Sequence, residues 1–361
     1  MGRKAPVLDL LKVMALMAVF GQGITGALLS GQPKVEWAVM LVLLTQALKF
    51  SAPFFIFAIC IDLAEKSDAD HQRHIRTKAR HLLLPYAGWT VAYLLASVSM
   101  HAFAPLRIIS ALLLGTAAPH LWYVVMMFQF QLLAPACRRA RLCVARGRGH
   151  TAVLLSFGFL TSLAYILLYR HFSPALPSWA DLLFNRGFIG FMAFGCLGIA
   201  ILAEEERGAR WPAVIPPLAG LLVVPVFLLA CREALPHGIA PSLHQVIYLK
   251  PSTFLYNVLL LAAAYGGARF CVLRGWGAGP AIRWLSSMAY KAFLANVFVS
   301  RLILWCLGLV NLEVTNLPSL LAVWLATAIG SFALAHAIDC LGKSMIYMNW
   351  RPERIRHDVH E

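Results

Sequence analysis

Charged residues are scarce in this chain. Only 13% of its 361 residues are charged, whereas an average soluble domain has roughly 25%. Long hydrophilic stretches are equally rare, since the longest cover residues 64–81, 137–150 and 342–361, and none is long enough for a soluble domain. The sequence also lacks low-complexity segments and any internal repeat strong enough to indicate the inverted halves of many transporters. These absences exclude an ordinary soluble protein.

The chain is instead rich in apolar sequence, with 60% hydrophobic residues and a mean hydropathy of +0.72. A helix needs about 20 apolar residues to cross the core of a bilayer, so we predict an all-α, polytopic integral membrane bundle of about ten transmembrane helices. The apolar runs are residues 7–29, 37–62, 82–101, 119–136, 151–169, 182–203, 211–230, 252–273, 284–309 and 317–341. The segment 105–118 is apolar but short, which favours an interfacial or re-entrant piece.

Most of the positive charge lies in alternate gaps between these runs. The termini and even-numbered gaps hold 21 Lys and Arg residues, counting Arg269 at the end of the eighth run, and the odd-numbered gaps hold five. Because cytoplasmic loops carry the excess of Lys and Arg, both termini are predicted to be cytoplasmic. Residues 1–341 then form a single membrane domain and residues 342–361 a short basic cytoplasmic tail. Since the bases are restricted to short loops, the net charge of +15 does not indicate nucleic acid as a partner.

The first predicted span carries polar residues, which are costly in hydrocarbon and are therefore candidates for function. Asp9 and Lys12 lie one helical turn apart near the cytoplasmic end and can pair, and Gln22 lies deeper. Lys12 has an alternative role, because a lysine near a helix end can extend its ammonium group to the interface.

Candidate chemistry at the opposite face centres on the start of the fourth span, where His120 stands beside Trp122 and Tyr123. A histidine can act as a general base near neutral pH, and it can equally be a polar cap at a helix end. Trp and Tyr at a helix start are usually interface anchors.

The second basic loop offers a different chemistry, because Arg76, Lys78 and Arg80 are spaced by two residues. Such charge orients a membrane bundle without any ligand. Alternatively, it binds the phosphates of a cytoplasmic donor through charge-assisted hydrogen bonds. The sequence leaves both interpretations open.

The ninth span contains two cations, Lys291 and Arg301, together with Tyr290 and Asn296. Two cations in one apolar helix are hard to explain by snorkelling alone. We therefore expect at least one of them to face a wet cavity or an acidic partner, for which the candidates are Asp62, Asp181 and Glu313.

Two further patterns have plain structural interpretations. The glycines of the sixth span favour close helix packing over room for a substrate chain, and they are Gly187, Gly190, Gly195 and Gly198. The acidic run at 204–206 is expected to be a solvated helix end.

Taken in order, these motifs resemble the membrane acyltransferase-3 family, whose members modify bacterial surface glycans and related acceptors. The resemblance runs almost end to end. It rests on Asp9 to Lys12 for an opening Asp-x-x-Arg helix, SAPFFIFAICIDL at 51–63 for a Phe-Phe-rich helix, Arg76 to Tyr86 for a basic stretch before Leu-Leu-Pro-Tyr, HLWYVVMMFQFQLLAP at 120–135 for a Leu-Trp-Phe/Tyr helix, and Ala289 to Asn296 for a Ser-Tyr-x-x-Tyr-Leu-x-His helix. The third and fourth matches are the most specific. Such a family implies a helical bundle around a cavity, an acyl-CoA donor and transfer to a sugar hydroxyl.

The chain departs from the family pattern at several positions. The family's first helix carries Arg, ten residues and then His, whereas here Lys12 replaces the Arg, and Gln22 is the polar residue nearest the His position at Gly23. In the late helix Ala289 replaces Ser and Asn296 replaces His. Neither Gln nor Asn takes up a proton at neutral pH, and the loss of a general base costs roughly 100- to 10,000-fold in rate. His120 is therefore the first candidate for the base.

The resemblance predicts a bacterial inner-membrane acyltransferase. It would pass an acetyl or succinyl group from cytoplasmic acyl-CoA to a hydroxyl of a glycan or lipid-linked sugar, with polysaccharide-export machinery as a candidate partner and no metal or permanently bound cofactor. Arg76, Lys78 and Arg80 would bind the donor, and His120, Lys12 and Gln22 would serve catalysis. The substrate cavity would include Asp9, Trp122, Tyr123, Tyr290, Lys291 and Asn296.

Two alternatives remain at this point. One is a catalytically inactive relative that transports or scaffolds a glycan, which the departures from the family pattern favour. The other is an anion transporter lined by Lys291 and Arg301, against which the absence of a repeat counts.

Overall fold

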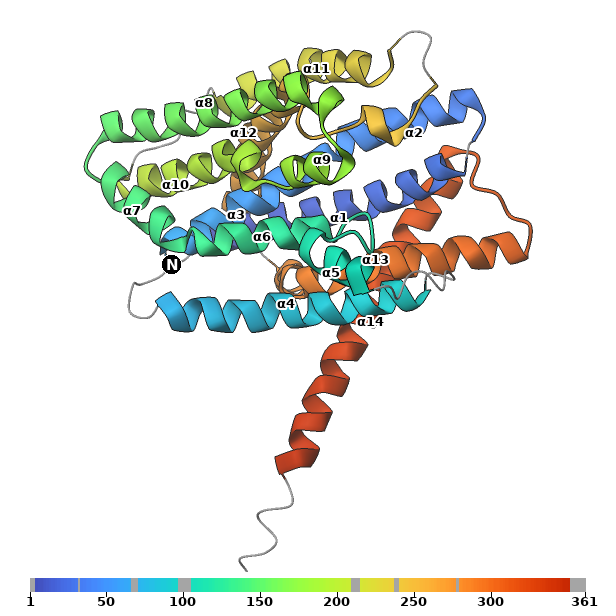
Figure 1. Ribbon diagram of the computed structural model, residues 1–361. Coiled ribbons are helices and arrows are strands. Elements are labelled where there is room, and N and C mark those ends of the chain that lie inside the picture. Colours follow the sequence, from blue (N-terminus) through green and yellow to red (C-terminus); the bar gives the residue numbers. More distant parts are fainter. Residues whose placement is uncertain are drawn as a thin grey trace, which may run out of the picture.

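The computed structural model describes residues 4–31, 33–65, 71–96, 105–208, 215–236, 240–276 and 279–350, and these residues form helices and no β-strand (Figure 1). The α-helices are α1 (Lys4–Ser30), α2 (Val35–Ala47), α3 (Ser51–Glu65), α4 (His71–Ala96), α5 (Pro105–Leu114), α6 (Trp122–Leu132), α7 (Ala134–Val144), α8 (Arg148–Phe172), α9 (Ser178–Asn185), α10 (Met192–Glu206), α11 (Ile215–Ala234), α12 (Pro251–Leu273), α13 (Pro280–Leu309) and α14 (Leu317–Trp350). Short 3₁₀ helices are η1 (Leu48–Phe50), η3 (Ser173–Ala175), η4 (Phe188–Phe191) and η5 (Leu243–Gln245). Helices suit this sequence because a backbone in hydrocarbon must satisfy its own hydrogen bonds.

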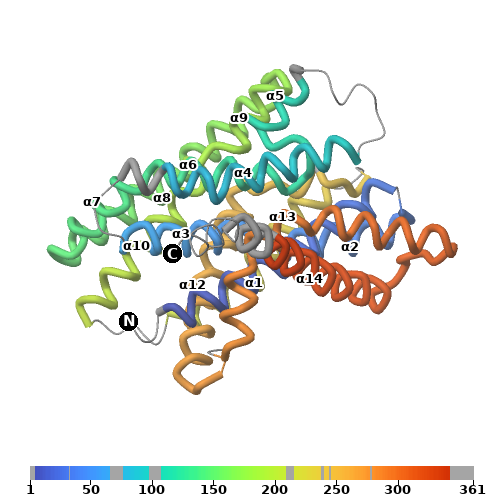
Figure 2. Tube along the Cα trace, turned by 90° about the horizontal axis from the view of Figure 1, so that it is seen from below, coloured from blue at the N-terminus to red at the C-terminus, as the bar shows by residue number. Residues whose placement is uncertain are grey.

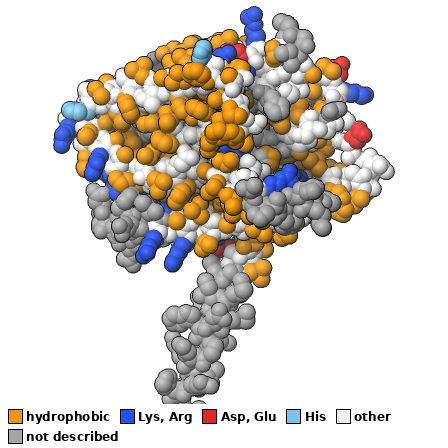
Figure 3. Space-filling model, viewed as in Figure 1, with side chains coloured by type: hydrophobic (Ala, Val, Ile, Leu, Met, Phe, Trp, Pro, Cys, Tyr) orange, Lys and Arg blue, Asp and Glu red, His pale blue; other side chains and the backbone are white. Residues whose placement is uncertain are grey.

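Within the described ranges, eight helical segments are long and apolar enough to cross a membrane. They are Ala5–Ser30, Val35–Glu65, Arg148–Ala175, Ser178–Glu206, Ile215–Ala234, Pro251–Leu273, Pro280–Leu309 and Leu317–Leu341. The other two predicted spans correspond to α4, which begins with basic residues, and to the short α6 followed by α7. The predicted all-α, polytopic membrane bundle is confirmed. Figure 3 agrees, since apolar side chains cover the middle of the visible face and Lys and Arg lie mainly near its edges.

Helix α1 lies inside the bundle and packs against α2, α3, α12, α13 and α14 (Figure 2). Its side chains Leu11, Leu16 and Phe20 are completely buried. Around this centre, α11 pairs with α12, α13 pairs with α14, and α10 packs against α3 and α8. Helix α14 continues to Trp350, beyond the predicted end of the last span, and residues 351–361 of the predicted basic tail lie outside the described residues.

The second predicted span is not one continuous α-helix. The 3₁₀ helix η1 interrupts it between α2 and α3, and the Leu48 carbonyl at this interruption accepts a hydrogen bond from the amide of Gln22. A side-chain donor thus serves a carbonyl at the break, as the low dielectric of a membrane interior requires. The break also brings Lys49 to the edge of a cavity described below.

The glycines of the sixth span are packing residues. A Cβ atom on Gly198 would lie 2.7 Å from the Phe57 carbonyl oxygen, and one on Gly195 would lie 2.7 Å from the Cys60 Sγ. Real Cβ atoms do not approach other atoms so closely, so α10 and α3 can touch only because these positions lack a side chain. The structure therefore favours close packing over room for a substrate chain.

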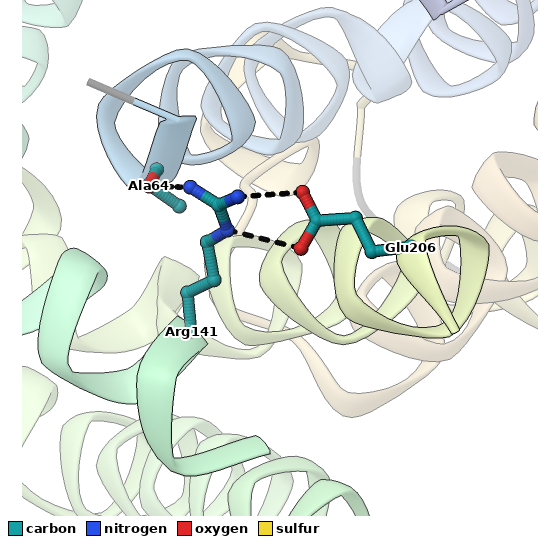
Figure 4. A network of polar contacts seen from close by, with 3 residues as sticks. All are labelled: Ala64, Arg141 and Glu206. Carbon is teal, nitrogen blue, oxygen red and sulfur yellow. Dashed lines mark hydrogen bonds and ion pairs between the residues drawn. The ribbon is translucent and has the colours of Figure 1, made fainter. Parts of the chain in front are cut away.

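The acidic run at the end of α10 joins helices together. Arg141 of α7 forms a bidentate pair with Glu206, with a shortest N–O distance of 2.7 Å, and also donates to the Ala64 carbonyl at 3.0 Å (Figure 4). Glu204 pairs with Arg207, and Glu205 accepts a hydrogen bond from Tyr265. The run is thus a clamp between α3, α7, α10 and α12 rather than a freely solvated helix end.

A glycine turn positions the residues before α6. Gly115 has φ 62°, and a Cβ atom there would lie 2.5 Å from the Trp122 backbone nitrogen. Only glycine accepts both the left-handed conformation and this close approach. After α5 the chain therefore folds back on itself, and Pro119 to Tyr123 enter the bundle.

Candidate active site

A cavity with a volume of about 490 Å³ lies beside the C-terminal half of α1. Its walls come from α1, the α2–η1–α3 segment, residues 119–123, residues 243–248 and α13. We call it the outer cavity, because the predicted topology directs this half of α1 away from the cytoplasm. Its volume falls within the roughly 300–1,000 Å³ typical of small-molecule sites.

A closed hydrogen-bond ring forms one wall of the outer cavity. The Gln22 amide donates to Ser51 Oγ at 2.9 Å, the hydroxyls of Ser51 and Tyr248 lie 3.0 Å apart, and the Tyr248 hydroxyl donates to Gln22 Oε1 at 3.2 Å. Lys49 lies against this wall, with its ammonium nitrogen 4.4 Å from the centroid of the Tyr248 ring. Because its amide is satisfied on both sides, Gln22 is held in one orientation and shapes the cavity.

His120 is the one imidazole among the described side chains that line the outer cavity, and it is only 8% exposed. Its ring packs edge-on against Tyr93 and Phe293, with centroid distances of 5.6 Å and 4.9 Å. Neither ring nitrogen makes a hydrogen bond of ordinary geometry within the described structure, and the Tyr93 hydroxyl donates elsewhere, to the Leu294 carbonyl. Buried polar atoms are rarely left unpaired, so these nitrogens are candidate partners for a ligand.

A second cavity of about 180 Å³ lies toward the N-terminal half of α1, and we call it the inner cavity. Its polar lining includes Lys12, Asp62, Lys78, Gln131 and Tyr290. The Lys12 ammonium pairs with the Asp62 carboxylate at 3.1 Å. The inner cavity therefore combines two cations with one acid at the end of the bundle that the charge pattern assigns to the cytoplasm.

The two cavities share three lining residues, Phe55, Tyr123 and Phe293. Their rings are in contact, since the centroid of Tyr123 lies 5.6 Å from that of Phe55 and 5.7 Å from that of Phe293. We call these three side chains the aromatic partition. The two spaces lie toward opposite ends of α1. A single layer of side chains, the aromatic partition, separates them.

Comparison with protein-family models matches residues 6–336 to a family described as an acyltransferase domain, acyltransferase-3. The chain belongs to the acyltransferase-3 family. The match includes every residue that lines the two cavities, and it confirms the resemblance of the sequence motifs. Comparison with curated proteins and with solved structures gives no match. This acyltransferase-3 protein is a multi-pass membrane protein with an acyltransferase domain.

The structure distributes the predicted catalytic residues of this acyltransferase-3 protein over both cavities. His120 and Gln22 line the outer cavity, and Lys12 lines the inner one. Trp122 contributes to the outer cavity, and Tyr123 belongs to the partition. Lys12 and Gln22, both predicted to serve catalysis, therefore lie in two adjoining spaces and not in one.

The predicted donor-binding residues lie on α4. Lys78 is half-buried and lines the inner cavity, whereas Arg76 and Arg80 are exposed on the same helix. No group of three or more His, Cys, Asp or Glu side chains in the described part of the chain is arranged to hold a metal ion.

The ion pairs within the membrane differ from those expected. Asp9 does not pair with Lys12 but accepts a hydrogen bond from Ser286 at 2.6 Å. Lys291 pairs with Asp339 of α14, which was not among its expected partners. Each of these contacts joins two different helices, through residues 277 and 48 positions apart, whereas helical spacing reveals only neighbours on one helix.

Three of the predicted cavity residues occupy positions outside the two linings, and they are Asp9, Lys291 and Asn296. Asn296 is buried, and its amide donates to the backbone carbonyl of Phe293, whose side chain belongs to the partition. Tyr290 does line the inner cavity and donates to the Leu82 carbonyl at 2.6 Å.

Sequence reasoning overlooked Lys49, Ser51 and Tyr248. Lys49 could have been found by asking which Lys and Arg residues belong to no loop, because it lies inside the second predicted span. Ser51 and Tyr248 gave no comparable indication, since their importance depends on the hydrogen-bond ring with Gln22.

Proposed function

We propose that this protein is a bacterial inner-membrane acyltransferase that passes an acetyl or succinyl group from acyl-CoA to a hydroxyl of a glycan or lipid-linked sugar. The observation that carries the proposal is the meeting of the two cavities at the aromatic partition, with His120 in contact with Phe293. The donor approaches from the inner side and the acceptor from the outer side, so the two substrates need not share one entrance.

The inner side suits the donor. Arg76, Lys78 and Arg80 supply positive charge for the phosphates of CoA, and Lys12 adds charge inside the inner cavity. At about 180 Å³ the inner cavity is smaller than typical ligand sites. It therefore suits the acyl thioester end, while the nucleotide stays at the cytoplasmic face beside α4.

The chemistry assigned to His120 is general-base catalysis. The acceptor hydroxyl gives its proton to an imidazole nitrogen as its oxygen attacks the thioester carbonyl carbon. The new C–O ester bond forms, the C–S bond breaks, and the departing CoA thiolate takes the proton from the His120 imidazolium and leaves as the thiol. Neither nitrogen of His120 makes a hydrogen bond of ordinary geometry with a described residue, so one can serve the hydroxyl.

In this proposal the aromatic partition is a barrier to water. It keeps bulk water on the two sides apart while the acyl group and the acceptor hydroxyl meet at its surface. Exclusion of water protects a reactive ester from hydrolysis. In this proposal the product acceptor leaves from the outer side, where export machinery for the glycan would receive it.

The proposal is tested with purified protein in lipid nanodiscs, acetyl- and succinyl-CoA labelled in the acyl group, and a panel of simple glycosides as acceptors. Label is expected to move to an acceptor with the wild-type protein and not with His120→Ala, while acyl-CoA stabilises both proteins against heat. Equal transfer by the His120→Ala protein would remove His120 from the mechanism.

A second candidate function is a non-catalytic bundle that transports or scaffolds a glycan. Two observations favour it: Gln22 is engaged in the hydrogen-bond ring, and no described residue orients His120 through a hydrogen bond of ordinary geometry. On this alternative acyl-CoA gives no thermal stabilisation and no acyl transfer, whereas a glycan ligand still binds.

A further inference from the structure

Six Lys and Arg residues lie inside the predicted spans rather than in the gaps between them, and they are Lys12, Lys49, Arg186, Arg269, Lys291 and Arg301. Four of them have polar partners in the structure. Lys12 pairs with Asp62, Arg269 with Glu205 and Lys291 with Asp339, and Arg186 donates to the Leu114 carbonyl.

The remaining two, Lys49 and Arg301, behave differently. Neither makes a hydrogen bond or an ion pair with any residue that the structure describes, and both line the outer cavity. A charged side chain at membrane depth is costly, and where it persists it usually serves a ligand or an ion pathway. Both unpartnered cations therefore face the same space.

Charge in the outer cavity has a single sign. Its described lining contains Lys49 and Arg301 but neither Asp nor Glu. Lys49 is half-buried, and its ammonium group lies over the face of the Tyr248 ring. An aromatic face attracts a cation without accepting its hydrogen bonds, so the donors of Lys49 remain available to an anion.

Arg301 brings the second charge close to His120. It extends from α13 and lines the outer cavity together with His120. A planar guanidinium forms two parallel hydrogen bonds with a carboxylate or a phosphate. An acidic group seated between Lys49 and Arg301 would hold the rest of the same molecule beside His120.

We propose that the molecule transferred or acylated in the outer cavity carries an acidic group, a carboxylate or a phosphate, which Lys49 and Arg301 bind. The part of this inference that concerns acylation rests on the proposed function. The acidic group belongs either to the acceptor, as in a uronic acid, or to the acyl group, as in succinyl. The phosphates of CoA are a poor fit, because the nucleotide would have to cross the aromatic partition.

The first arm of the test measures binding to the purified protein by titration calorimetry, without acyl-CoA, using methyl glucuronide and methyl glucoside as probes. If the acid is on the acceptor, the glucuronide binds about tenfold more tightly than the glucoside. Lys49→Gln and Arg301→Gln remove this preference, Lys49→Arg retains most of it, and Arg232→Gln has no effect because Arg232 is exposed outside the cavity.

The second arm compares acetyl- with succinyl-CoA as donors to the neutral glucoside. If the acid is on the acyl group, succinyl transfer exceeds acetyl transfer and falls selectively in Lys49→Gln and Arg301→Gln. The proposal is overturned if the protein does not distinguish the two glycosides and also shows no charge-dependent preference between the donors. Charge-dependent glucuronide binding without any acyl transfer would instead support the acidic-ligand site and reject the proposed enzyme activity.

Discussion

The imidazole of His120 stands edge-on to the ring of Phe293, with centroids 4.9 Å apart, and Phe293 lines both cavities. The one imidazole among the described residues that line the outer cavity is thus in contact with the barrier between the two spaces. In the proposed function, this contact keeps the base next to a donor on the inner side. This contact is the geometric basis for the following predictions on catalysis.

Replacement of His120 by alanine is expected to lower kcat by roughly 100- to 10,000-fold, the usual contribution of a general base. The dissociation constant of acyl-CoA should stay within about twofold of wild type, because His120 lies on the outer side of the partition. Single-turnover transfer and equilibrium binding measure the two quantities. His171→Ala is a matched control, since His171 is exposed at the end of α8.

Truncation of the partition at Phe55 should open a passage for water. In Phe55→Ala we expect hydrolysis of acyl-CoA without acceptor to rise about tenfold, because exclusion of water suppresses this side reaction. Release of free CoA thiol measures the rate. Phe298→Ala serves as a control, since Phe298 is an exposed ring on α13 that lines neither cavity. Equal hydrolysis by the wild type and Phe55→Ala would show that the partition does not exclude water.

The Lys12–Asp62 pair should determine the net charge of the inner cavity, and therefore the affinity of the protein for CoA. Asp62→Asn removes the acid of the pair and is expected to strengthen CoA binding by about threefold to tenfold, whereas Lys12→Met should weaken it by a similar factor. Both effects should shrink at high salt, since the pair is partly exposed and therefore screened. Titrations of CoA at low and high ionic strength provide the measurement. The decisive result is a change in CoA affinity of opposite sign in the two variants.

Helix packing can be tested without any substrate. Gly198→Ala should destabilise the protein by about 1–3 kcal/mol, because the new methyl group would press on the Phe57 carbonyl. Gly220→Ala in α11 adds the same methyl group where no atom lies within 4 Å, so its effect should be small. Thermal unfolding in one detergent compares the two. Similar losses in both variants would refute tight packing of α10 on α3.

The sequence predicts those parts of the fold that depend on local properties of the chain. Apolar runs and the alternating basic gaps predict the membrane bundle, because the length of a span and the cost of charge in lipid are local properties. The break at η1 was not predictable in this way, since Leu48 and Lys49 interrupt a run that remains apolar enough to span.

The site was predictable only in part for the same reason. His120, Trp122 and Tyr123 stand out as polar or amphipathic residues at a helix start, and the structure does bring them to a cavity. The partners of Lys12 and Lys291 lie 50 and 48 residues away in sequence. Such pairings depend on which helices pack together, which no single span reveals.

The aromatic partition also has an electrical consequence. If water fills both cavities, most of the membrane voltage falls across the thin layer formed by Phe55, Tyr123 and Phe293. Moving one elementary charge through 100 mV changes its energy by about 2.3 kcal/mol. A neutral acetyl group crosses this layer without sensing the voltage. A succinyl carboxylate, by contrast, is driven outward by an inside-negative potential, so the energised state of the membrane would help to select the group that is transferred.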